Sequence, residues 1–149
     1  METAKTMTND QIISFLANIP LFARLKKGHV EKLAKRCHEL NYSPGETIVE
    51  QGKVGVGLFI LVKGQVEVSR SHEDGTSIHL QNLEPPSFFG ELSLLDDQPR
   101  TATVRAVPAS TCLAINKLDF LDELNSDPEM AVEMLKDLAS RFRRVVQQL

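Results

Sequence analysis

The stretch LFILVKGQVEVSR, residues 58–70, decides the fold class of this chain. The first half is rich in Leu, Ile, Val and Phe, the second has valines at 66 and 68, and Lys63-Gly64 separates the halves. Branched and aromatic residues favour strands, and glycine favours a turn between them. The stretch therefore predicts two strands joined at residues 63–64. The next signal, DGTSIHL (residues 74–80), predicts a hairpin turn and a further strand.

Working outward, short apolar runs alternate with Gly and Pro signals from Tyr42 to Asn116. About eight strands at such spacing predict a small antiparallel barrel or jelly roll. The residues before this region have helical spacing, and Asn9 or Asp10 can cap the first helix. We therefore expect one α+β domain over residues 1–149, with N-terminal helices in 1–40, an antiparallel jelly-roll-like β-roll in 41–116, and two C-terminal helices, a hinge and a lid, in 117–149.

The composition excludes several classes of protein. The net charge of −3 argues against nucleic acid or an anionic membrane as the main partner. No apolar run reaches the 18 or so residues needed to span a bilayer. Two cysteines are too few for a disulfide framework, so a reducing cytoplasm is the expected location. The four histidines lack the spacing of metal ligands, so we expect no metal, no cofactor and no enzyme activity.

The candidate ligand-binding residues are concentrated in FFGELSLLDDQPRTATV, residues 88–104. Gly90 lets the backbone approach a ligand, and a helical turn from Glu91 presents free N–H groups suited to an anion. Arg100 adds a permanent charge whose fork matches phosphate oxygens. Glu91 would be repelled by that anion and suits a sugar hydroxyl instead. Residue chemistry thus indicates phosphate plus ribose, with a structural Glu91–Arg100 pair that braces a loop as the alternative.

The same stretch resembles the phosphate-binding cassette of the cyclic nucleotide-binding domain family, F-G-E-[LI]-[AS]-L-…-P-R-[AST]-A-[TS]-V. Upstream, YSPGETIVEQGKVGVGLFILVKGQVEV (residues 42–68) resembles the strands that precede that cassette. The resemblance implies cyclic AMP or cyclic GMP as the ligand. It also implies that Glu91 binds the ribose 2′-OH and that Arg100 binds the exocyclic phosphate oxygens. The backbone N–H groups of Leu92, Ser93 and Ala102 would complete the phosphate-binding site, and Gly90 would leave room for the sugar.

Three further positions bear on the resemblance. Thr101 is also threonine in cyclic GMP-dependent kinases, where its hydroxyl reaches the guanine 2-amino group, but channel domains that respond to cyclic AMP carry it too. We therefore expect cyclic AMP with cyclic GMP tolerated; a threonine chosen for β-propensity is the alternative. Arg141 falls where a bacterial channel-type domain has an arginine over the purine, or else it complements its helix dipole. Val56 replaces the aspartate that orients the arginine in kinase A-like domains.

The expected function is a non-catalytic cyclic nucleotide sensor whose last helix closes over the base, with Leu118 to Leu124 as hinge. Because the sequence stops at Leu149, we expect the output to pass through an unknown effector protein, or the chain to be an excised piece. The alternative is a degenerate domain that serves as an interaction or dimerisation module. Apolar residues with heptad spacing favour a homodimer through the C-terminal helix or packing on the chain's own barrel: Ala131, Leu135, Leu138, Phe142, Val145 and Leu149.

Overall fold

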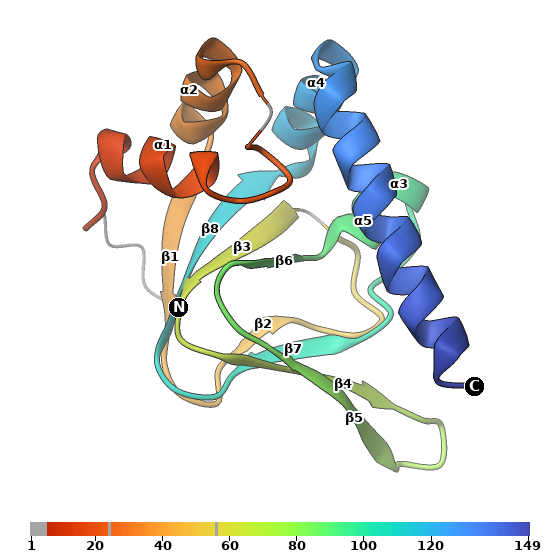
Figure 1. Cartoon of the computed structure of the whole chain (residues 1–149). Helices are drawn as coiled ribbons and strands as arrows, with labels where there is room; N and C mark the ends of the chain where they lie inside the picture. The colour runs from red at the N-terminus through yellow and green to blue at the C-terminus, as the bar shows by residue number, and fades with distance from the viewer. Residues whose placement is uncertain (1–5, 24, 56) are drawn as a thin grey trace. The chain divides into compact units, whose positions relative to one another are not determined.

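The computed structural model describes residues 6–23, 25–55 and 57–149 (Figure 1). It divides into two compact units, one formed by Thr6 with residues 37–120 and the other by residues 7–36 with 121–149. The elements of the described residues are α1 (Asn9–Ala17), α2 (Lys27–Lys35), β1 (His38–Tyr42), β2 (Thr47–Val49), β3 (Gly57–Lys63), β4 (Val66–Ser71), β5 (Ser77–Leu83), β6 (Ser87–Phe89), α3 (Glu91–Asp96), β7 (Thr103–Ala106), β8 (Ser110–Asn116), α4 (Lys117–Ser126) and α5 (Pro128–Gln147).

The first unit is a β-roll. Its described strands form two four-stranded sheets in the orders β1-β8-β3-β6 and β2-β7-β4-β5, and every pairing is antiparallel. Side chains from both sheets share one buried core, which burial of apolar surface stabilises. The core cluster consists of Tyr42, Val49, Phe59, Leu61, Val66, Val68, Phe89, Val104, Ala106 and Cys112. The predicted antiparallel β-roll with about eight strands is confirmed.

The strands of residues 58–70 lie in different sheets, because β3 and β4 do not pair with each other. Gly64, at the turn between them, has φ +98°, a left-handed conformation that favours glycine. A Cβ there would lie 2.2 Å from Ser110 Oγ and 2.8 Å from the Ala109 carbonyl oxygen. The chain therefore crosses from one sheet to the other at a position that admits no side chain. The hairpin predicted after β4 is present and joins it to β5 (Figure 1).

The β-roll starts earlier than residue 41. β1 begins at His38, which pairs with Ala114 of β8. The next residue, Glu39, is buried, and its carboxylate accepts hydrogen bonds from the backbone N–H and the hydroxyl of Thr6. Sequence patterns gave no sign of this, because a buried glutamate does not look like a strand residue.

The first helix is capped by Thr8 and not by Asn9 or Asp10. The Thr8 hydroxyl accepts from Gln11 N at 3.1 Å, while Thr8 N donates to Gln11 Oε1 at 2.9 Å. This reciprocal arrangement satisfies two backbone donors at once. The correction follows from spacing, because the glutamine stands three residues after the threonine.

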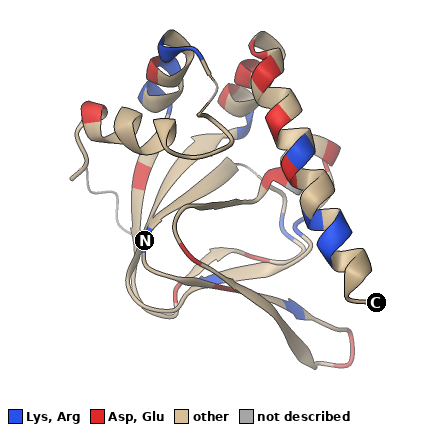
Figure 2. Cartoon of the chain, in the orientation of Figure 1, with Lys and Arg blue, Asp and Glu red and all other residues tan. Residues whose placement is uncertain are grey.

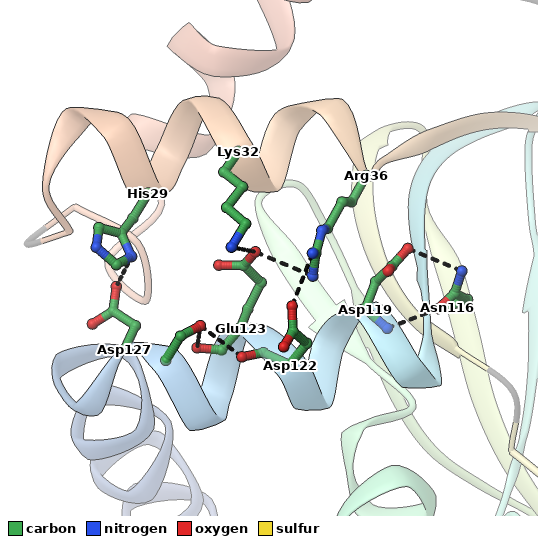
Figure 3. A network of polar contacts seen from close by, with 9 residues as sticks. His29, Lys32, Arg36, Asn116, Asp119, Asp122, Glu123 and Asp127 are labelled. Atoms are coloured by element: carbon green, nitrogen blue, oxygen red, sulfur yellow. Dashed lines mark hydrogen bonds and ion pairs between the residues drawn. The ribbon is translucent and has the colours of Figure 1, made fainter.

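The second unit carries a group of ion pairs between α2 and α4 (Figure 3). Glu123 has a side-chain exposure of 2% and lies 3.3 Å from Arg36 Nη1 and 3.9 Å from Lys32 Nζ. Arg36 also contacts Asp122 at 2.8 Å. A carboxylate buried this deeply requires a cationic partner, because an unpaired buried charge is costly. The pairs therefore tie α2 to α4.

Helix α5 begins at a capped end. Asp127 accepts from Met130 N at 3.3 Å and lies 3.2 Å from His29 Nδ1, while Pro128 occupies the first helical position. Both Met130 and Met134 are buried, one helical turn apart. The buried stripe of the first half of α5 is therefore formed by methionines and not by the predicted heptad positions.

No described helix has both the length and the apolar character needed to cross a membrane. Within the same residues, no group of three or more His, Cys, Asp or Glu side chains could hold a metal ion.

Candidate functional site

The stretch 88–104 folds as β6, a tight turn, α3 and β7. The Phe89 ring stacks on Phe59 of β3 with ring centroids 5.5 Å apart, which anchors β6 in the sheet. Gly90 then adopts φ +93° and is the N-cap of α3. A Cβ on Gly90 would lie 2.6 Å from Arg100 Nη1 and 3.1 Å from the Gly57 carbonyl oxygen. The glycine therefore serves both the turn and the close approach of the arginine.

Arg100 is held from both its side chain and its backbone. The side chain is 7% exposed; Nη1 donates to the Gly90 carbonyl at 2.5 Å and Nη2 to the Gly57 carbonyl at 2.9 Å. The Arg100 N–H donates to the Lys53 carbonyl, and the Arg100 carbonyl accepts from Gly52 N, both at 2.8 Å. The start of β3 and the turn after β6 thus hold the guanidinium, and the turn before β3 holds the backbone of Arg100.

Two effects act in opposite directions on the pKa of Arg100. Burial lowers the pKa of Arg100, and the nearby carboxyl of Glu91 raises it. Glu91 is 3% exposed at the first position of α3. Because arginine stays protonated in proteins, the site holds a permanent cation with little water around it. The guanidinium donates to the Gly90 and Gly57 carbonyl oxygens, and the Glu91 carboxylate also acts on its charge.

The other predicted residues of the cassette surround this arginine in sequence and belong to the same unit. Leu92 and Ser93 lie in α3, and Ser93 is 5% exposed. Thr101 is exposed and Ala102 is half-buried, and both precede β7. Arg141 belongs to α5 in the second unit, where its Nε lies 2.8 Å from Asp137 Oδ2. Its place over a base stays a prediction.

Sequence reasoning missed the glycines that face the cassette. A Cβ on Gly55 would lie 2.6 Å from Ser93 Cβ and 3.1 Å from Arg100 Cζ. Gly57 supplies the carbonyl that accepts from Arg100. The available signal was the group of three glycines in GKVGVG, residues 52–57. Val56, the position of the missing aspartate, lies outside the described residues.

A family model described as the cyclic nucleotide-binding domain matches residues 39–127, which include all of β1 but its first residue, the whole cassette and α4. The chain belongs to this family. The family resemblance read from the cassette is confirmed. The matched region contains Arg100 and the two glycines, Gly57 and Gly90, whose carbonyls accept from it.

Individual relatives agree with membership. The chain is 35% identical over 107 residues, 72% of its length, to a cAMP-dependent protein kinase regulatory subunit of Blastocladiella emersonii, and covers 27% of that protein. It is 36% identical over 102 residues, 68% of its length, to a cGMP-dependent protein kinase of Plasmodium berghei, and covers 11% of that protein. The crystal structure of the Thermus thermophilus catabolite activator protein matches with a TM-score of 0.80 at 32% identity, covering 87% of this chain and 61% of that one. The chain therefore spans only part of each relative.

Proposed function

We propose that this chain is a non-catalytic sensor that binds 3′,5′-cyclic AMP in the β-roll and tolerates cyclic GMP. The observation that carries the proposal is a single buried guanidinium, Arg100, held by the Gly57 and Gly90 carbonyls beside the buried carboxylate of Glu91. Relatives named as a cAMP-dependent kinase regulatory subunit and a cGMP-dependent kinase support both ligands.

The roles of the cassette residues follow from their chemistry. The two carbonyls use two of the five N–H donors of Arg100, which leaves donors for the exocyclic phosphate oxygens. Glu91 accepts from the ribose 2′-OH, the one ribose hydroxyl that a 3′,5′-cyclic phosphate leaves free. Backbone N–H groups of Leu92, Ser93 and Ala102 complete the cradle, and Gly90 leaves room for the sugar.

Binding is transmitted through the C-terminal helices. The boundary between the two units falls inside α4, between Phe120 and Leu121, within the expected hinge 118–124. A nucleotide that binds better when Arg141 covers its base would shift the population toward that state. An effector protein, or a further part of a longer chain, would read this shift.

The test is calorimetric titration of the parent and of Arg100→Ala with cyclic AMP. Losing one partner of a buried charged pair costs about 2–5 kcal/mol, so the variant should bind at least ~30-fold more weakly. Arg105→Ala is the matched control: it removes an arginine from an exposed position of β7 and should leave affinity unchanged. Equal affinity of the parent and Arg100→Ala would refute the assignment.

A second candidate function is dimerisation through α5, which an exposed apolar stripe favours. Leu135 is 65% exposed and Phe142 71% exposed, at heptad spacing, with Val145 and Leu149 also exposed. Figure 2 shows basic residues gathered in the C-terminal half of α5. Sedimentation with and without nucleotide tests this candidate. A dimer that Phe142→Ser abolishes supports it, and a monomer at all concentrations excludes it.

A further inference from the structure

Arg70 is a second arginine beside the cassette, and no role in phosphate binding explains it. It lies near the end of β4, and its Nη1 donates to the Thr101 carbonyl at 2.5 Å. Thr101 directly follows the phosphate-binding candidate Arg100 in sequence. The contact therefore places a guanidinium where the cassette leaves α3 and enters β7, within the same compact unit.

The register of β4 with β7 places Arg70 beside the end of the cassette. Side chains alternate between faces along a strand, and Val66 and Val68 of β4 both belong to the core cluster. The pairing of β4 with β7 is unbroken from Val66↔Ala106 to Ser69↔Thr103. Continued by one residue, this register sets Arg70, which is exposed, opposite Ala102, which packs against the core.

The guanidinium of Arg70 is available to a ligand. Arg70 is exposed, and within the part of the chain that the structure describes its hydrogen-bond partner is the Thr101 carbonyl. That bond uses one of five N–H donors. Arg105 of β7 differs, because it pairs in register with Glu67, on the opposite face from Val68. The two exposed arginines of this sheet therefore form a matched pair, and Arg70 is the one that contacts Thr101.

We propose that Arg70 is a specificity residue that increases affinity for purine cyclic nucleotides with an oxygen at position 6. Guanine presents two acceptors, O6 and N7, that match the fork of an arginine, whereas adenine presents a donor at position 6. An arginine has no acceptor for that donor. The inference rests on the proposed function and deepens it. Arg70 of β4 would contact the 6-position of the base, while Thr101 would contact the 2-amino group.

The alternative role for Arg70 is purely structural. A guanidinium that only braces the Thr101 carbonyl would hold the cassette for every nucleotide alike. Inosine 3′,5′-cyclic phosphate separates the roles, because its base has the 6-oxygen of guanine and lacks the 2-amino group. A loss shared by cyclic GMP and cyclic IMP, but not by cyclic AMP, reports on the 6-oxygen alone.

The experiment is titration of the parent, Arg70→Ala, Arg70→Lys and Arg105→Ala with cyclic AMP, cyclic GMP and cyclic IMP, with thermal unfolding of each as a check. Arg70→Ala should weaken cyclic GMP and cyclic IMP about tenfold, the lower part of the range for one bidentate arginine–guanine contact, and cyclic AMP less than about twofold. Arg70→Lys keeps the charge without the fork and should recover only part of the loss. Arg105→Ala should change none of the three.

Equal weakening of all three nucleotides in Arg70→Ala, or no weakening of any, overturns the inference and leaves the proposed function standing. A parent that binds no cyclic nucleotide overturns the proposed function itself, and the inference with it. Should Arg70→Ala unfold, Arg70→Lys decides: selective loss of the two 6-oxo nucleotides supports the role, and uniform affinity excludes it.

Discussion

Replacing Gly55 with alanine tests how tightly the turn before β3 packs on the cassette. The added Cβ would lie 2.6 Å from Ser93 Cβ, closer than real carbon atoms approach, and 3.1 Å from Arg100 Cζ. Ser93 and Arg100 are both buried, so neither has free space to move into. The strain therefore falls on the two residues that the proposed site uses.

The magnitude follows from packing. Overpacking a closed core by one methyl group costs about 1–3 kcal/mol. The loss of freedom of the unfolded chain returns about 0.4–1 kcal/mol on a glycine-to-alanine change. We therefore expect Gly55→Ala to lower the free energy of unfolding by about 1–2 kcal/mol. If Arg100 shifts and weakens one charge-assisted hydrogen bond to the phosphate, affinity for cyclic AMP falls about tenfold, or about 1.4 kcal/mol.

The assays are urea unfolding and calorimetric titration, with Gly28→Ala as the matched control. Gly28 lies in α2, and a Cβ there would meet no heavy atom within 4 Å. The control should therefore gain stability, by about 0.5–1 kcal/mol, and keep its affinity. A Gly55→Ala protein with the stability and affinity of the parent would show that the turn does not press on the cassette, and the described geometry of the site would be wrong.

Three further predictions concern stability. Arg36→Ala should lower the free energy of urea unfolding by about 3 kcal/mol, because it leaves the buried Glu123 without its nearer cation. Lys32 is 52% exposed and lies 3.9 Å from Glu123, so Lys32→Ala should cost less than about 1 kcal/mol. Equal losses in the two variants would contradict the described pairing. Burial raises the pKa of the Cys37 and Cys112 thiols from 9.0 to about 12, so the unfolded chain releases their protons first. Their contribution to stability is thus complete below pH 9 and lost between pH 9 and 12, and a Cys37→Ala/Cys112→Ala variant should lose less across that window; parallel curves would argue against burial of the thiols. Asp127→Ala, which removes the cap of α5, should cost about 1 kcal/mol in thermal or urea unfolding, and no change would mean that the cap is not formed.

Many of the strands and turns could be predicted from local sequence patterns. The strands on either side of Gly64 and the hairpin at residues 74–80 could be predicted because a continuous apolar run in β3, alternating valines in β4 and turn residues stand next to one another. The sheet assignment could not, because β3 and β4 are adjacent in sequence and pair with other strands. Pairing partners such as β1 and β8 are far apart in the chain, and no local signal specifies them.

The candidate site also has residues that the sequence predicts and contacts that it does not. The residues of the cassette, Glu91 and Arg100 among them, were predictable because they stand together in one motif. The partners of Arg100 were not, because a backbone carbonyl such as that of Gly57 exists at every position and carries no sequence signature. The position of Arg70 could not be predicted either, because the pairing of β4 with β7 brings it to the end of the cassette.

Titration of the parent chain with cyclic AMP, cyclic GMP and linear 5′-AMP tests the binding of a cyclic phosphate most directly. A pocket formed by Arg100 and the turn of α3, with Glu91 on the sugar, predicts saturable binding of both cyclic nucleotides and binding of the linear nucleotide at least tenfold weaker, or about 1.4 kcal/mol. Absence of binding by either cyclic nucleotide, or equal affinity for the linear one, would contradict it.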